Sequence, residues 1–156
     1  MSKRKSLMNY DVEKNVDPHQ LIESLGIRYV DIVLDQIFGV FPYPGNLPLE
    51  NLAERCELSL EVFTSQLIEV RTLQKRLELK SEDIKKKQNS LFLDTRARWE
   101  WEKNGLSNSE WLWDYSLAEL KELDNIVLIS NTGRRAFAAA AGLSEAGVVC
   151  HYLCNS

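Results

Sequence analysis

The chain has 156 residues, of which 44% are hydrophobic and 27% charged, and its formal net charge is −4. This length and composition allow a buried hydrophobic core and exclude wholesale disorder. No apolar run approaches the roughly 18–20 residues that a transmembrane helix needs, and the basic residues at positions 3–5 are not followed by an apolar stretch, so we expect neither a membrane span nor a secretory signal.

The first part of the chain is predicted to be helical. We expect residues 1–16 to form a flexible N-terminus. Asp17 and Pro18 are typical of a helix start, and the short helix that they begin ends before Gly26. Residues 28–39 carry apolar side chains at helical spacing, which predicts a strongly amphipathic helix.

Two further helices are predicted after a turn. Residues 41–46 contain two prolines and a glycine, which cannot continue the preceding helix. Pro48 begins a helix that runs to Cys56, and Ser59 caps the next one. Apolar residues recur every three or four positions in that next helix, at Phe63, Leu67, Val70, Leu73 and Leu77.

Residues 77–93 leave two alternatives open. Residues 77–80 and 90–94 both alternate between apolar and polar side chains, so they could pair as a hairpin. Alternatively, Leu77 and Ile84 could lie on one long helix. We favour the helix, because the charged residues in this stretch are better helix formers than strand formers.

All four tryptophans lie between Arg96 and Tyr115. The pairs Ser107–Glu110 and Ser116–Glu119 both match the capping box, in which the two side chains satisfy each other's backbone donors. This pattern predicts two short helices in a tryptophan-rich segment.

The end of the chain predicts one strand and two helices. Residues 125–129 form an apolar run that is the best strand candidate. Asn131 or Thr132 would cap an alanine-rich helix over residues 134–141. Ser144 would start a last helix.

Residues 48–73 contain two predicted helices that meet at a turn. Ala53 is small, so the second helix can cross close over the first, and Leu58 would fill the gap beneath the turn. Ser59 would cap the second helix, and Glu57 stands where glycine is usual. This pattern resembles the helix-turn-helix of bacterial winged-helix regulators.

The resemblance implies a mainly α fold. A winged-helix-like core would span residues 17–93, and a tryptophan-rich helical C-terminal extension with at most a small β element would span residues 94–156. The implied function is that of a non-enzymatic regulator that acts through DNA contacts, protein contacts or both. The alternative is a protein-binding adaptor or inhibitor that uses an apolar, tryptophan-rich surface and binds no nucleic acid.

The candidate site residues follow from the face of the second helix and from the basic residues near it. If this helix entered a major groove, Arg71 would be its only cation, whereas Leu60 and Ile68 would be exposed and apolar, as on a partner-binding face. The candidate DNA contacts are Ser59, Thr64, Ser65, Arg71, Lys85, Lys86 and Lys87. The candidate partner contacts are Leu60, Ile68, Trp99, Trp101, Trp111 and Trp113.

The cysteines and histidines predict no metal site. Three cysteines are an odd set, which does not indicate a disulfide framework, so we expect a reducing, cytoplasmic setting. Cys150, His151 and Cys154 are close in sequence, but a structural zinc needs four ligands, and only Cys56 and His19 remain.

No set of nucleophile, base and orienting residue is visible, so we expect no enzyme and no cofactor. The expected partner is a protein or a second copy of the chain, with DNA as a further candidate. The sequence signals no membrane and no small-molecule substrate.

Overall fold

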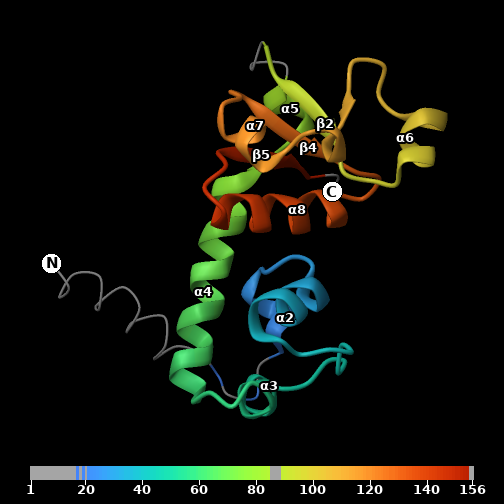
Figure 1. The fold of residues 1–156 in the computed structure, drawn as a ribbon. Helices are drawn as coiled ribbons and strands as arrows, with labels where there is room; N and C mark the ends of the chain where they lie inside the picture. Colours follow the sequence, from blue (N-terminus) through green and yellow to red (C-terminus); the bar gives the residue numbers. More distant parts are fainter. Residues whose placement is uncertain (1–16, 18, 20, 85–88, 155–156) are drawn as a thin grey trace, which may run out of the picture. The chain divides into compact units, whose positions relative to one another are not determined.

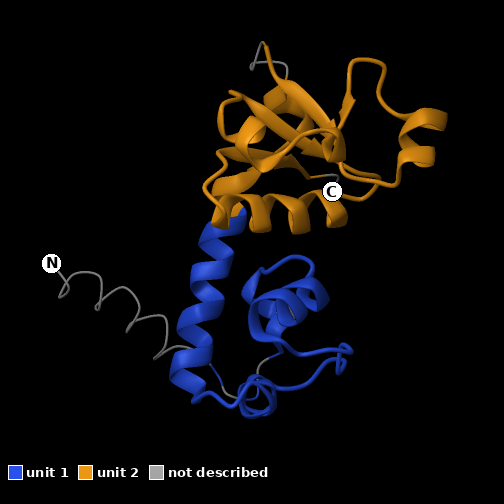
Figure 2. Cartoon of the chain, in the orientation of Figure 1, with its two compact units in different colours: residues 1–74 blue, residues 75–156 orange. Residues whose placement is uncertain are grey.

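The computed structural model describes residues 17, 19, 21–84 and 89–154. The chain forms two compact units, residues 1–74 and residues 75–156 (Figures 1 and 2). We refer to them as the N-terminal unit and the C-terminal unit. The boundary between them falls within one helix, α4 (Leu60–Leu77).

The N-terminal unit is helical. Phe38 packs edge-on against Phe63, with ring centroids 5.0 Å apart. The buried Gln74 accepts a hydrogen bond from the backbone N–H of Arg28 at 2.9 Å and donates one to the carbonyl of the same residue at 2.7 Å. Besides α4, the helices of this unit are the 3-10 helix η1 (Ile22–Leu25), α2 (Val30–Phe38) and α3 (Leu49–Arg55).

Helices α3 and α4 meet at a tight turn. Glu57 has a φ of 57°, in the left-handed region that glycine usually occupies. Ala53 is buried, and its carbonyl accepts the N–H of Leu58 at 3.0 Å. Ser59 caps α4, since its hydroxyl accepts the N–H of Val62 at 3.2 Å. The predicted positions of the two helices, the small residue and the cap are confirmed.

The C-terminal unit contains a five-stranded parallel sheet with the strand order β1-β5-β4-β2-β3 (Figure 1). In the register of the central strands, Asp94 lies beside Ile129 and Ile126 lies beside Cys150. The strands are β1 (Glu78–Leu79), β2 (Leu91–Asp94), β3 (Glu110–Trp111), β4 (Ile126–Ile129) and β5 (Cys150–Leu153).

Helices connect these strands, as parallel pairing requires. The result is an α/β, Rossmann-like arrangement. The connecting helices are α5 (Ser81–Ile84), α6 (Arg98–Asn104), the 3-10 helix η2 (Leu112–Asp114), α7 (Leu117–Lys121) and α8 (Arg134–Glu145).

Helix α8 packs on β4 and β5 and forms one side of the core. Its Ala136 and Ala140 are fully buried, and these small side chains allow the helix to lie close to the sheet. Phe137 meets Tyr152 edge-on, with ring centroids 5.4 Å apart. A separate apolar cluster comprises Leu79, Val127 and Ile129, with the partly buried Phe92 and Leu153 packed against it.

The predicted fold class is therefore wrong. The mainly α, winged-helix-like core expected over residues 17–93 does not exist, because residues 75–154 form an α/β unit around a parallel sheet. The described residues of this stretch, 77–84 and 89–93, form neither a wing hairpin nor one long helix. After α4 ends, β1, α5 and β2 follow, and both strands pair in parallel with strands from later in the chain.

The tryptophan-rich helical extension is wrong for the same reason. The strand expected over residues 125–129 is confirmed as β4, and the capping box of Ser116 and Glu119 is confirmed at the start of α7. However, Glu110 begins strand β3 instead of ending a capping box. The last helix, expected from Ser144, is also wrong, because Ser144 lies within α8 and residues 150–153 form β5.

We expect Leu128→Ala to lower the free energy of unfolding by about 2–5 kcal/mol, because Leu128 is fully buried at the centre of β4 and its truncation leaves a cavity. Val149→Ala is the matched control, since Val149 is 80% exposed just before β5, and it should change stability by less than about 0.5 kcal/mol. Chemical denaturation of both variants measures the difference. Equal stability of the two would contradict the placement of β4 in the core.

Candidate functional site

The topology of the sheet marks one place where a ligand site is expected. The chain leaves β2 through α6 toward β3, on one side, and leaves the neighbouring β4 through α8 toward β5, on the other side. The loops that follow these two strands therefore diverge. In open α/β sheets, ligands bind in the crevice at the carboxyl ends of the strands where the connections change direction.

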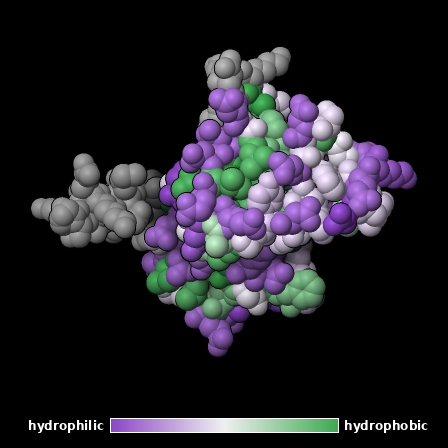
Figure 3. Space-filling view, turned by 45° about the horizontal axis from the view of Figure 1, so that its top comes forward, coloured by the Kyte–Doolittle hydropathy of each residue, from purple (hydrophilic) through white to green (hydrophobic). Residues whose placement is uncertain are grey.

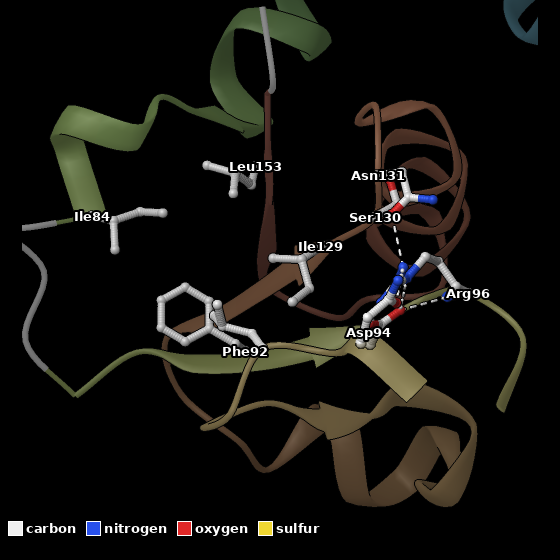
Figure 4. Close-up of a pocket in the computed structure, with 10 residues that line it drawn as sticks. Ile84, Phe92, Asp94, Arg96, Ile129, Ser130, Asn131 and Leu153 are labelled. Atoms are coloured by element: carbon white, nitrogen blue, oxygen red, sulfur yellow. Dashed lines mark hydrogen bonds and ion pairs between the residues drawn. The ribbon is translucent and has the colours of Figure 1, made fainter. Parts of the chain in front are cut away.

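A pocket of about 470 Å³ lies at this point (Figure 4). Its volume is within the range of small-molecule sites. The apolar part of its lining comprises Ile84, Phe92, Leu106, Ile129 and Leu153. The polar part comprises Asp94, Arg96, Asn104, Ser130 and Asn131.

A buried ion pair forms the centre of the polar part. The guanidinium of Arg96 donates to both oxygens of the Asp94 carboxylate, from Nε to Oδ1 at 3.0 Å and to Oδ2 at 3.2 Å, and from Nη2 to Oδ2 at 2.8 Å. The two side chains are only 7% and 1% exposed. The hydrogen bond to Asp94 raises the pKa of Arg96 against the opposing effect of burial, so this side chain stays charged.

The same guanidinium reaches two further segments. Its Nη1 donates to the amide oxygen of Asn104 at 3.1 Å and to that of Asn131 at 2.7 Å. Asp94 ends β2, Asn104 ends α6, and Asn131 lies in the loop after β4. Arg96 therefore ties together three segments that border the pocket, and we call this set of contacts the Arg96 clamp.

Two tryptophans hold the backbone of the loop after β2 by hydrogen bonds. The indole N–H of Trp111 donates to the carbonyl of Arg96 at 2.9 Å, and that of Trp113 donates to the carbonyl of Thr95 at 3.3 Å. The guanidinium of Arg98 lies over the ring of Trp111, 5.3 Å from its centroid. These contacts fix the backbone that carries the Arg96 clamp.

In the loop after β4, the hydroxyl of Ser130 accepts hydrogen bonds from the backbone. The hydroxyl of Ser130 accepts the N–H of Gly133 at 3.1 Å and that of Ala136 at 3.2 Å. Gly133 is the N-cap of α8 with a φ of 84°, so the cap predicted at Asn131 or Thr132 is wrong. Ser130 thus supplies an acceptor to the first turn of the helix.

A second ion pair joins α6 to α8. Arg135 Nη1 lies 2.7 Å from Glu100 Oε1, and the Glu100 side chain is 14% exposed. The hydrogen bond from Arg135 lowers the pKa of Glu100, and a further bond from the N–H of Ala97 acts in the same direction. This pair holds the start of α6 close to the start of α8.

The residues predicted as DNA contacts do not line the pocket. Ser59 caps α4, Thr64 is 1% exposed, and Arg71 donates to the carbonyl of Leu25 at 3.0 Å. Ser65 is half-buried in α4, and Lys85, Lys86 and Lys87 lie outside the described residues.

The residues predicted as partner contacts also lie outside the pocket lining. Leu60 and Ile68 are half-buried in α4. Trp101 donates to Ser109 at 3.2 Å, while Trp99 is 67% exposed. Trp111 and Trp113 donate to the backbone of the loop after β2.

The sequence predicts no ligand site at the residues that form the clamp, and Asn131 is predicted only as a candidate helix cap. Asp94 and Arg96 directly follow the apolar residues of β2, and Asn131 follows those of β4. Polar residues just after two buried strands are a recognisable signal when the strands are parallel, because their carboxyl ends then meet at one edge. The sequence alone does not reveal this signal at residues 90–94, because their alternation also fits one strand of a hairpin.

Comparisons with protein-family models, with curated protein sequences and with solved structures gave no significant match. The resemblance to winged-helix regulators is wrong, because the sheet that dominates the C-terminal unit has no counterpart in that fold. The function predicted from it, a regulator built on a helix-turn-helix, is wrong as well. The fold likewise gives no support to the adaptor alternative.

The pocket is suited to holding a ligand by non-covalent contacts. Among the described residues that line it, none is a histidine, cysteine or lysine, and its two charged side chains bind each other. No group of three or more potential metal-binding side chains occurs among the described residues. The pocket therefore offers apolar contact and hydrogen bonds.

We expect Arg96→Met to lower the free energy of unfolding by about 3–5 kcal/mol, because it leaves the Asp94 carboxylate buried without a counter-charge. The double variant Asp94→Asn/Arg96→Met should lose less unfolding free energy than Arg96→Met alone, because it leaves no buried charge. The control is Arg55→Met at an exposed position of α3, which should change stability by less than about 0.5 kcal/mol. A double variant as unstable as the single one would show that the buried charge is not the cause.

Glu100 should titrate below an ordinary glutamate, because Arg135 stabilises its ionised form. The stability contributed by this pair is therefore present above the ordinary glutamate pKa and is lost as the pH falls through the lowered pKa. Carboxyl-carbon NMR titration measures this pKa directly. In Arg135→Gln the pKa of Glu100 should rise, because the hydrogen bond that lowers it is removed. An unchanged Glu100 pKa in this variant would argue against the contact.

Proposed function

We propose that the C-terminal unit binds a small organic ligand in the pocket at the carboxyl ends of β2 and β4. The observation that supports this most is the coincidence of the pocket with the point where the sheet connections diverge. The Arg96 clamp keeps the surrounding segments in place, so the pocket is formed before the ligand arrives. Preorganisation of this kind lowers the cost of binding.

The lining indicates how such a ligand would lie. Its apolar body would contact Phe92, Ile129 and Leu153, which lie together on one side of the pocket (Figure 4). Its polar end would point toward Arg96 and Asn104 on the other side. Apolar contact supplies most of the affinity in such sites, and a few hydrogen bonds fix the orientation.

The expectation that the chain is not an enzyme remains part of this proposal. The described lining combines an ion pair with amide and hydroxyl groups, and this set includes no base positioned against a nucleophile. A small ligand was not expected from the sequence, and the pocket is the reason for proposing one.

A protein partner or a second copy of the chain also remains a prediction. Hydrophobic residues reach the surface among hydrophilic ones (Figure 3). Trp99 and Trp113 are 67% and 60% exposed, and tryptophan is enriched where proteins bind each other.

A cytoplasmic location is proposed on the basis of the cysteines. None of Cys56, Cys150 and Cys154 forms a disulfide, which fits a reducing compartment. In the described part of the chain, no helix combines the length and the apolar character that crossing a bilayer demands.

The ligand proposal is tested by screening a fragment library with ligand-observed NMR. We expect Ile84→Trp to abolish binding of the fragments that bind the unmodified protein, because the larger ring enters the pocket from α5. Val62→Trp, at a 44% exposed position of α4, is the matched control and should retain binding. If no fragment distinguishes the two variants, this pocket is not the ligand site.

A further inference from the structure

The charges at the polar end of the pocket cancel. Two nitrogens of the Arg96 guanidinium, Nε and Nη2, donate to the Asp94 carboxylate, and both side chains are almost completely buried. A guanidinium in such a two-point contact has its charge compensated by the carboxylate that it holds. The pair therefore presents little net charge to a molecule in the pocket.

Some of the neighbouring groups that commonly attract anions are engaged as well. The N–H groups at the start of α8 would favour an anion, but those of Gly133 and Ala136 donate to the Ser130 hydroxyl. The cation of Arg135 is bound by Glu100 at 2.7 Å.

What remains at the polar end is suited to neutral hydrogen bonding. Asn104 accepts from Arg96 through its amide oxygen, and its amide nitrogen has no hydrogen-bond partner among the described residues. Asn131 is the other amide of the lining. A neutral polar group needs only a hydrogen-bond partner when it leaves water, whereas a buried ion also needs a counter-charge.

We propose that the ligand of this pocket is an uncharged molecule, with an apolar body and a carboxamide, carbonyl or hydroxyl end. This inference depends on the proposed function, because it concerns the same pocket. It assigns Asp94 a role in specificity, since the carboxylate cancels the charge that would otherwise recruit anions to Arg96.

The test uses three probes of nearly the same shape and different charge, namely benzamide, benzoate and benzamidine. Their affinities for the full-length protein are measured by ligand-observed NMR titration. We expect benzamide to bind at least tenfold more tightly than either ion. Ile84→Trp should abolish benzamide binding, and Val62→Trp should leave it unchanged.

Two variants test the electrostatic cause. In Asp94→Asn the charge of Arg96 is no longer cancelled, so benzoate should become the preferred probe, with a change of at least tenfold in the benzoate-to-benzamide ratio. If this variant does not fold, Asn131→Asp serves instead, because Asn131 is exposed and the substitution keeps the buried pair. It should shift the preference toward benzamidine.

Each outcome decides one part of the account. If benzoate binds the unmodified protein as tightly as benzamide does, the pocket does not select an uncharged ligand. The proposal that the pocket binds a small ligand is not contradicted by that result. Unchanged preferences in the charge variants would reject Asp94 as the specificity residue. If no probe binds, or if Ile84→Trp does not affect binding, the proposed ligand site is wrong and this inference is wrong with it.

Discussion

The contact between Arg96 and Asp94 is the interaction on which the candidate site depends. A charge as deeply buried as Asp94 is tolerated only beside a counter-charge, and Arg96 supplies one from two residues further along the chain. The guanidinium also donates to Asn104 and Asn131. The side chain that neutralises Asp94 therefore also joins the three segments that border the pocket. The Arg96 side chain therefore both compensates the charge of Asp94 and maintains the shape of the pocket.

The sheet explains why these groups meet. Parallel strands place all their carboxyl ends at one edge, and β2 and β4 are direct neighbours, so residues more than thirty positions apart lie within hydrogen-bond distance. Thr95 reinforces this arrangement, since its backbone N–H and its hydroxyl both donate to the carbonyl of Ile129. The pocket forms where the connections diverge, and its polar and apolar parts follow from which residues end each strand.

Local patterns predicted what depends on neighbours in sequence. The capping box at Ser116, the turn at Glu57 and the apolar run of β4 were all found, because caps, turns and buried strands have short signatures. The sheet was not found, since β1 and β3 have two residues each and β5 follows a segment that resembled a helix start. Parallel partners lie far apart in sequence, so a short apolar segment such as β2 does not reveal what it pairs with. The sequence predicts no role for Arg96, because Asn104 and Asn131 become its neighbours only through the fold.

The most direct test of this account is the hydrogen exchange of the Arg96 side chain, observed by nitrogen-detected NMR of the arginine Nε–H groups. We expect the Nε–H of Arg96 to exchange slowly, since Asp94 accepts it in a buried environment. The exposed Arg55 provides the rate of an arginine in water. An Arg96 Nε–H that exchanges as fast as that of Arg55 would contradict the clamp, and with it the pocket that the clamp holds in shape.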